Sequence, residues 1–244
     1  TADPATVDFP IFYVKRTIPE DSADLRALRD TVGNADLFKR DRASPSAPET
    51  NLTERITGPD DLYDIKDVEV SFDGLKVAFA MRGPIDENQD EEDAPTWAIW
   101  EYDIATDTLR RLVSSDTIAN EGNDIAPHYL PDERIVFSSP GQRAAKGVLL
   151  DEGKTAFEAQ TDDRSESAFV LHVMNAMGGD VRQVSFNQSH DLDPTVLSNG
   201  RILWSRWDRA PGNDGMHLYT SNPDGTDVQL LYGANSHATG TNDQ

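Results

Sequence analysis

The feature that most constrains this 244-residue chain is a repeat. Three segments share an Asp, an apolar strand, a turn and a second apolar strand, and they begin at Asp64, Asp124 and Asp191. The turns hold the pairs Asp73-Gly74, Asp132-Glu133 and Asn199-Gly200. Such residues tolerate the positive φ that a tight hairpin needs. Each segment therefore predicts an antiparallel hairpin, and the recurrence predicts a repeat architecture.

A second turn signature follows each of these hairpins. Asp103, Asn175 and Asn222 each open a turn that leads into an alternating strand, which predicts a second hairpin in every repeat. Two hairpins make four strands, the blade of a β-propeller. The N-terminal part supplies only three such strands, at 10–15, 36–40 and 51–56. Its innermost strand is missing, and propellers usually cover such an unpaired edge by borrowing a strand from the far terminus.

The predicted fold class is therefore all-β, a β-propeller of four-stranded blades in one region that spans 1–244. We expect about four blades that belong to a larger ring or to a ring closed by a second copy, and a complete four-bladed ring is the remaining alternative. The predicted limits are 9–57 for the partial first blade, 61–115 for the second, 122–187 for the third with an insertion at 141–166, 190–232 for the fourth, and 233–244 for the start of a further blade.

Three irregular stretches interrupt the predicted blades. Residues 83–95 are acidic and flanked by prolines, which predicts a surface loop, and they lack the ligand order of an EF-hand. The insertion at 141–166 carries an apolar patch at 148–150 and is compatible with a short helix, a flap or a partner contact. Residues 22–32 have apolar residues at helical spacing and predict a short helix on the rim.

Composition narrows the classes of function. There are 22 basic and 44 acidic residues, a net charge of −22, so nucleic acid and anionic membranes are disfavoured as partners. The chain has no cysteine, which excludes disulfides, thiolate metal sites and c-type haem attachment in these residues. No apolar run is long enough to cross a bilayer. Nucleophile-elbow, P-loop, dinucleotide-binding and HExxH motifs are also missing.

Candidate site residues gather where the repeats open, because blade-opening loops converge at one mouth of a propeller channel. They are Asp64, Asp67, Asp124, His128, His190, Asp191 and Asp193, with His237 in the last segment. This set suits a divalent metal or acid–base work on a polar ligand. Equally, an Asp at a blade start can cap a turn through backbone N–H groups. Arg82, Arg206 and Asp208 are candidates for ion pairs between blades.

Two stretches resemble a known repeat. The segments Ser71-Phe-Asp-Gly-Leu-Lys-Val-Ala-Phe79 and Pro127-His-Tyr-Leu-Pro-Asp-Glu-Arg-Ile-Val-Phe137 are similar to the TolB-type propeller repeat, whose blades carry Pro-x-x-Ser-Pro-Asp-Gly-x-x-Ile-x-Phe. This resemblance implies an extracytoplasmic propeller that binds a protein partner.

A wider resemblance runs from about residue 9 to the end of the chain. The stretches that carry it are Phe169-Val-Leu-His-Val-Met-Asn-Ala-Met-Gly-Gly-Asp180, Asn187-Gln-Ser-His-Asp-Leu-Asp-Pro-Thr-Val-Leu197, Gly200-Arg-Ile-Leu-Trp-Ser-Arg-Trp-Asp208 and Leu231-Tyr-Gly-Ala-Asn-Ser-His-Ala-Thr-Gly-Thr241. Together they resemble bacterial proteins similar to the propeller-containing middle region of the hydrazine synthase alpha subunit. The resemblance implies a periplasmic or cell-surface location, a lipid anchor outside these residues, and a longer whole protein.

The haem chemistry of that family cannot be carried over, because its CxxCH sites have no counterpart in a chain without cysteine. Two hypotheses follow. The first is a non-catalytic scaffold that binds a protein partner in an envelope or redox complex and has no cofactor of its own. The second is the non-haem part of a larger redox or metal-dependent enzyme, with a His/Asp site at the channel mouth.

Overall fold

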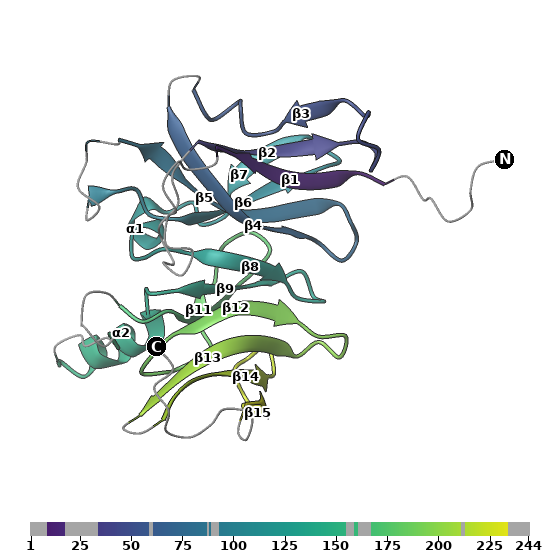
Figure 1. Ribbon diagram of the computed structural model, residues 1–244. Coiled ribbons are helices and arrows are strands. Elements are labelled where there is room, and N and C mark those ends of the chain that lie inside the picture. The colour runs from purple at the N-terminus through teal and green to yellow at the C-terminus, as the bar shows by residue number, and fades with distance from the viewer. Residues whose placement is uncertain are drawn as a thin grey trace.

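The computed structural model describes residues 9–17, 34–58, 61–86, 88, 93–154, 159–160, 167–210 and 213–233, apart from the side chains at 145, 208–210 and 213–214. These residues form four consecutive antiparallel sheets, one of three strands and three of four (Figure 1). Each four-stranded sheet keeps its strands in chain order from one edge to the other, as in a propeller blade. The predicted all-β, propeller-type fold is confirmed.

The first two sheets hold seven strands among the described residues. In the first sheet these are β1 (Ile11–Arg16), β2 (Ala35–Arg40) and β3 (Glu49–Asn51). In the second they are β4 (Leu62–Val70), β5 (Lys76–Ile85), β6 (Ala98–Asp103) and β7 (Thr108–Arg111).

The last two sheets hold eight strands, again among the described residues. The third sheet contains β8 (Ile125–Tyr129), β9 (Ile135–Ser139), β10 (Val170–Met174) and β11 (Arg182–Gln183). The fourth contains β12 (Asp191–Val196), β13 (Ile202–Ala210), β14 (Asn213–Ser221) and β15 (Gln229–Tyr232). Two helices, α1 (Asp116–Ala119) and α2 (Arg143–Asp151), lie in connections, and no described helix is long and apolar enough to span a membrane.

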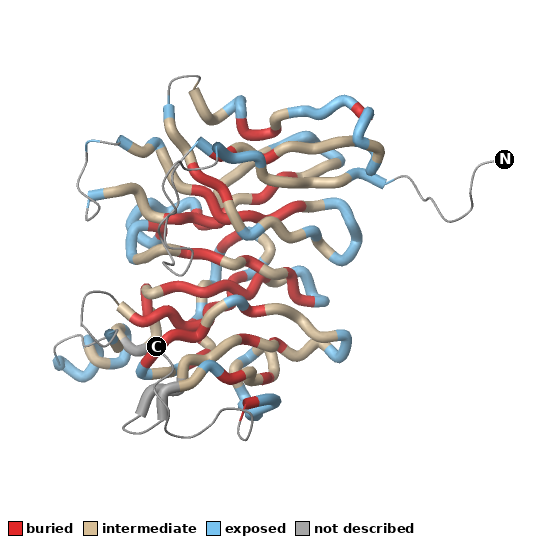
Figure 2. The backbone as a smooth tube through the Cα atoms, viewed as in Figure 1, coloured by how far each residue is buried: buried red, intermediate tan, exposed pale blue. Residues whose placement is uncertain are grey.

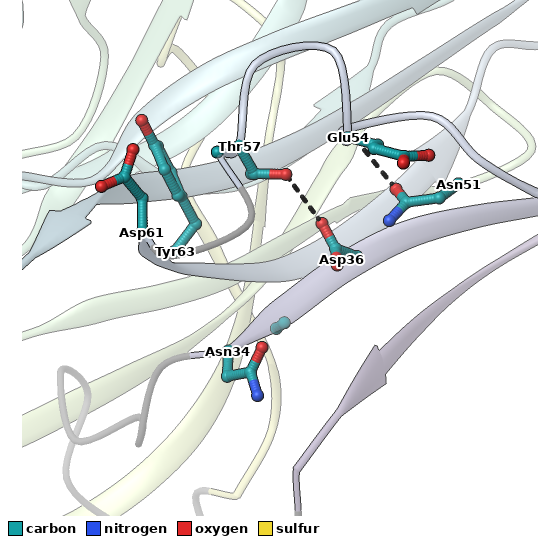
Figure 3. Close-up of a pocket in the computed structure, with 9 residues that line it drawn as sticks. Asn34, Asp36, Asn51, Glu54, Thr57, Asp61 and Tyr63 are labelled. Carbon is teal, nitrogen blue, oxygen red and sulfur yellow. Dashed lines mark hydrogen bonds between the residues drawn. The ribbon is translucent and has the colours of Figure 1, made fainter.

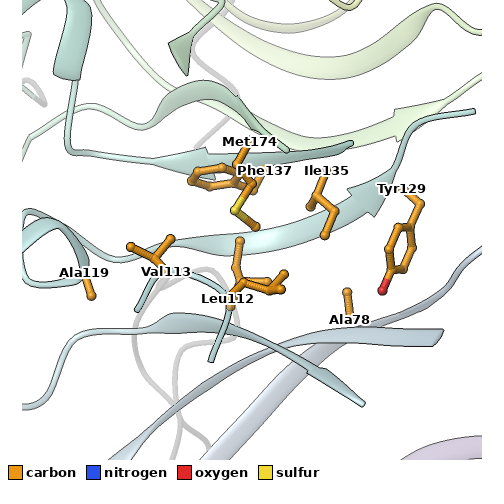
Figure 4. Packing of buried hydrophobic residues seen from close by; sticks show 9 residues of the cluster. Ala78, Leu112, Val113, Ala119, Tyr129, Ile135, Phe137 and Met174 are labelled. Atoms are coloured by element: carbon orange, nitrogen blue, oxygen red, sulfur yellow. The ribbon is translucent and has the colours of Figure 1, made fainter. Parts of the chain in front are cut away.

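The sheets stack face to face, and the hydrophobic core lies between them. Residues coloured as buried concentrate on the middle strands of the stack (Figure 2). Leu37, Phe79 and Tyr102 belong to a cluster shared by the first and second sheets. Figure 4 shows the next cluster, between the second and third sheets. The first and last sheets lie at opposite ends of the stack (Figure 1), so the described residues form an open arc.

One aromatic cross-strand pair recurs at the same register in all four sheets. A large aromatic residue on β1, β5, β9 or β13 faces a ring on the next strand along the chain. The pairs are Tyr13–Phe38, Phe79–Trp100, Phe137–His172 and Trp204–Tyr219. His172 stacks on Phe137 with ring centroids 5.6 Å apart, so it takes the place of an aromatic residue. The repeat identifies β1 as equivalent to β5, β9 and β13.

Turns and bulges explain the local geometry. Gly74, Glu133 and Gly200 have positive φ in the three predicted hairpin turns, and each N–H closes its turn on the carbonyl three residues earlier. The inner strands β4, β8 and β12 each contain a bulge. The bulge residue with left-handed backbone is Asp67 in β4, Ala126 in β8 and Asp193 in β12. Aspartate tolerates this conformation better than most residue types.

Some predicted elements differ from the structure. The strand expected at 51–56 ends at Asn51, because its Oδ1 accepts the N–H groups of Thr53 and Glu54 and turns the chain. β5 continues to Ile85, beyond the start of the loop expected at 83–95. The expected insertion at 141–166 contains α2. The helix expected at 22–32, His237 and the Asp208 side chain lie outside the described residues.

Candidate functional site at the insertion-bearing end

The two ends of the sheets carry different connections. At one end the strands are joined by tight turns such as 71–75, 130–134 and 197–201. At the other end lie the long connections 86–97 and 140–169, together with both helices (Figure 1). The inner strands also begin at this insertion-bearing end, which places Asp64, Asp124 and Asp191 there, whereas His128 lies near the tight-turn end of β8. Binding groups concentrate on long connections held by a rigid scaffold, so this end is the candidate functional site.

Asp191 is used inside the fourth sheet. Its carboxylate is fully buried and accepts two hydrogen bonds from Arg206, 2.7 Å from Nε and 2.8 Å from Nη2. The two residues face each other across β12 and β13. This ion pair lies within one sheet, because cross-strand register places the Arg206 guanidinium on the Asp of its own sheet. The expected pairing of Arg206 between blades stays a prediction. Such bidentate geometry offsets the cost of burying both charges.

Asp124 precedes β8 and is 1% exposed. The strand position that Arg206 occupies in the fourth sheet holds Ser139 here, and Arg143 reaches Asp124 instead from the start of α2. Nη2 of Arg143 lies 3.5 Å from Oδ1 of Asp124, and neither oxygen has a hydrogen-bond partner among the described residues. Burial outweighs this distant cation and raises the pKa of Asp124 to about 6.

Asp64 is also buried, but it lies one position out of step with the other two. Counted from the bulges, Ile65 occupies the place of Asp124 and Asp191, because β4 holds an extra residue before its bulge. Nη2 of Arg16 from the first sheet lies 3.5 Å from Oδ1 of Asp64 and donates to the Ile65 carbonyl. This pair joins two sheets, whereas Arg82 faces Asp64 within one sheet and lies over the Trp97 ring.

His190 has a backbone partner. Its Nδ1 accepts the Phe169 N–H at 3.1 Å, while the Asp191 N–H donates to the Phe169 carbonyl at 2.8 Å. The third sheet repeats this reciprocal pair, with the side chain of Asn123 and the backbone of Asp124 bonded to Trp97. The neutral His190 ring therefore carries its proton on Nε2. We interpret both pairs as latches between the end of one sheet and the start of the next.

The bulge residues bring two carboxylates toward the inner edge. Oδ2 of Asp67 accepts the Ala126 N–H at 2.9 Å, which links β4 to β8. Partial burial and the charge of Asp67 raise the pKa of Asp193, and Lys66 opposes this shift. Burial lowers the pKa of Lys66, against the charge of Asp67. Asp67, Asp193 and Lys66 thus form a small electrostatic group at the inner edge of the arc.

His128 bridges three inner strands. Its Nδ1 lies 3.2 Å from Glu69 Oε1 on β4, and its Nε2 lies 3.4 Å from Thr195 Oγ1 on β12. Glu69, His128 and Thr195 each close the bulge of their strand. Both ring nitrogens are engaged, so in this arrangement the imidazole stabilises the packing of neighbouring inner strands.

The expected site residues therefore do not converge on a single centre. Within the described part of the chain, no group of three or more His, Asp and Glu is arranged to hold a metal ion. Sequence reasoning missed Arg16, Arg143 and Lys66, which supply positive charges near Asp64, Asp124 and Asp193 in that order. Only Lys66 could have been found from the sequence, because it is the extra residue between Asp64 and the bulge residue Asp67. The other two come from another sheet and an insertion.

A pocket of about 440 Å³ opens at the same end, between the first and second sheets. Figure 3 shows its polar lining, with Asp36 in the middle and Asp61 beside Tyr63. Oδ1 of Asp36 accepts hydroxyl groups from Thr53 at 2.7 Å and Thr57 at 3.3 Å. Burial and the charge of Asp61 raise the pKa of Tyr63. The lining residues include three carboxylates and no basic side chain: Asn34, Ala35, Asp36, Asn51, Glu54, Thr57, Gly58, Asp61 and Tyr63.

Comparison with solved structures identifies a TolB-like propeller fold. Hydrazine synthase from Kuenenia stuttgartiensis is 18% identical with a TM-score of 0.56, and the match covers 82% of this chain and 28% of that chain. A putative TolB from Agrobacterium tumefaciens is 16% identical with a TM-score of 0.50, over 81% of this chain and 56% of that chain. This chain thus spans well under two thirds of both structures. No family model and no curated protein matches it.

Proposed function

We propose that this chain is the propeller region of an extracytoplasmic protein and acts as a non-catalytic docking module for a protein partner in an envelope or redox complex. One observation carries the proposal: the strand-start carboxylates are buried inside the protein, each beside an arginine. Asp191, Asp124 and Asp64 each have an arginine within 3.5 Å. Buried carboxylates are poor candidates for turnover, which requires a group that can reach a substrate.

The inserted helix α2 offers a contact surface at the same end. Val148 and Leu150 are 60% and 64% exposed. The base of the helix is anchored, because the Gln142 amide donates to the carbonyls of Ala159 and Ala168 at 2.9 Å, and its Oε1 accepts the Ala159 N–H. Exposed apolar side chains on an anchored element are typical of interaction sites.

The acidic pocket between the first two sheets supports the same proposal. Its lining of three carboxylates and Tyr63 suits a lysine or arginine side chain, through charge and through the aromatic face. A partner that carries both a basic and an apolar residue would match the pocket and α2. The net charge of −22 would speed its approach at low salt.

Co-purification from envelope extracts of the source cell tests the proposal. The double variant Val148→Ser, Leu150→Ser removes the exposed apolar pair on α2. A matched control, Val228→Ser, Leu231→Ser, removes a similarly exposed pair on the fourth sheet. We expect the first variant to lose at least tenfold of a partner that wild type and control retain. Equal recovery with all three proteins would exclude α2 as the docking surface.

The alternative is the non-haem part of a larger redox or metal-dependent enzyme. The two carboxylates at the inner edge favour this alternative, because the charge of Asp67 contributes to the raised pKa of Asp193. Two carboxylates are too few for a tight metal site, so further ligands would have to come from other residues. Stoichiometric metal in the native protein, lost in Asp193→Asn, would establish this alternative and remove the docking proposal's main support.

A further inference from the structure

The buried carboxylate of Asp124 lies beside the start of α2, the helix that carries the proposed docking surface. Neither of its oxygens has a hydrogen-bond partner among the described residues, and the residue is 1% exposed. Asp191, at the equivalent place in the fourth sheet, accepts two hydrogen bonds from Arg206. When Asp124 is ionised, the third sheet therefore contains a buried charge that lacks hydrogen bonds, and such a charge is costly.

The start of α2 is bonded to the body of the protein at three successive residues. Gln142 bonds to the insertion through its amide. Arg143 donates from Nε to the Glu121 carboxylate at 3.0 Å, and the Ala144 N–H donates to Gln183 Oε1 at 3.0 Å. Most described residues of the helix beyond this first turn are exposed. The helix is therefore held at its base, and its far end lies at the outside of the insertion-bearing end (Figure 1).

Several elements bring polar groups to this base. Nη2 of Arg143 on α2 lies 3.5 Å from Asp124 Oδ1, Glu121 in the connection after α1 adds a second negative charge, and Ser139 belongs to β9. On β10, burial and the charge of Arg143 lower the pKa of His172 to about 3. The pKa of Asp124 is about 6. Of the two buried titratable groups, Asp124 is thus the one that changes its charge between pH 5 and pH 8.

We propose that ionisation of Asp124 lifts the base of α2 from the third sheet, so that the docking surface is held in place at acidic pH and released as the pH rises. This inference rests on the proposed docking function and names its regulation. Water that enters when α2 lifts supplies the hydrogen bonds that the ionised carboxylate lacks, whereas a neutral carboxyl gains much less. A surface that is already held in place also binds its partner without the entropy cost of ordering it.

The direction of the effect follows from proton linkage. Lifting α2 exposes Asp124 to water and moves its pKa from about 6 toward the ordinary 3.8. The lifted form therefore binds the proton less tightly and is favoured as the pH rises. With these two values, the ratio of lifted to seated α2 should increase about tenfold from pH 5 to pH 8.

Hydrogen exchange of the whole chain at single-amide resolution measures this ratio. The N–H groups of Ala144 and Ala159 report it, because they bond to the side chains of Gln183 and Gln142 at the base of α2. After correction for the intrinsic pH dependence of exchange, we expect both amides to show the tenfold increase. The Val184 N–H, which bonds to the Leu171 carbonyl inside the third sheet, should not show it.

Three variants assign the effect to Asp124. Asp124→Asn should abolish the increase, because the amide does not ionise. Arg143→Gln removes the nearby cation, so it should move the midpoint of the increase to higher pH. Glu121→Gln is the matched control, since it removes a more exposed carboxylate that also bonds to Arg143 and should leave the increase in place.

Three results would overturn the inference: exchange that does not change with pH at Ala144 and Ala159, an increase that persists in Asp124→Asn, and an equal increase at Val184, which would indicate unfolding of the sheet. The measurement needs no partner. Unchanged exchange together with partner loss in Val148→Ser, Leu150→Ser would refute the regulation alone. The expected exchange together with full partner recovery in that variant would refute the docking surface and leave α2 as a pH-responsive element.

Discussion

Replacing Asp124 with Asn tests whether burial of its carboxylate destabilises the fold more than attraction to the distant Arg143 stabilises it. The pKa of this carboxyl rises from an ordinary 3.8 to about 6, and one unit corresponds to about 1.4 kcal/mol, so ionising it in the folded protein costs about 3 kcal/mol. Folded Asp124 holds its proton more tightly than the unfolded chain does. Its contribution therefore lowers the free energy of unfolding as pH rises from about 4 to about 6.

The assay is urea unfolding of wild type and Asp124→Asn from pH 4 to pH 8. Taking the difference between the two proteins at each pH cancels the titration of other groups. We expect the stability of the variant relative to wild type to rise by about 3 kcal/mol across this range. Asp132→Asn, on an exposed turn, serves as the control. A flat difference for Asp124→Asn, or a large loss at every pH, would refute the reasoning.

Three further predictions concern the remaining polar anchors. Asp191→Asn should lower the free energy of unfolding by about 3 kcal/mol in urea, because it leaves the Arg206 guanidinium without its bidentate carboxylate; a loss below 1 kcal/mol would contradict this. Gln142→Ala should raise protease cleavage within 141–166 at least tenfold, since two hydrogen bonds to Ala159 and one to Ala168 disappear; unchanged cleavage would show that other contacts hold the insertion. Bonds from Lys15 and Tyr13 lower the pKa of Glu49 to about 2, so the stabilisation that wild type has over Glu49→Gln should be present above pH 4.5 and disappear as pH falls toward 2, measured by thermal unfolding.

The fold could be predicted because its signals are local. Alternating strands and turn pairs such as Asn199-Gly200 recur within each repeat, and the hairpins that they predict need no information from distant parts of the chain. The sequence predicts a strand at 51–56, whereas β3 ends at Asn51. The prediction fails because an Asn at this position is compatible with a strand and with the start of an Asx turn. The side chain's bonds to Thr53 and Glu54 decide between them.

The candidate site was harder to predict because its partners are not local. The buried carboxylates were found from their place at the repeat starts. Arg143 reaches Asp124 from the start of α2, inside the insertion, and Arg16 reaches Asp64 from another sheet. One added residue before a bulge moved Asp64 out of step with Asp124. A hydrophobic pattern carries no such information about register between sheets.

Photocrosslinking from α2 tests the central claim most directly. A benzophenone amino acid is placed at Leu150 on the insertion-bearing end, and in a second protein at Leu231 on β15, which is similarly exposed. Both proteins are irradiated in the source cell and their adducts compared by mass spectrometry. The account predicts one dominant partner adduct from position 150 and none of it from position 231. The same adduct from both positions, or no adduct from position 150, would contradict it.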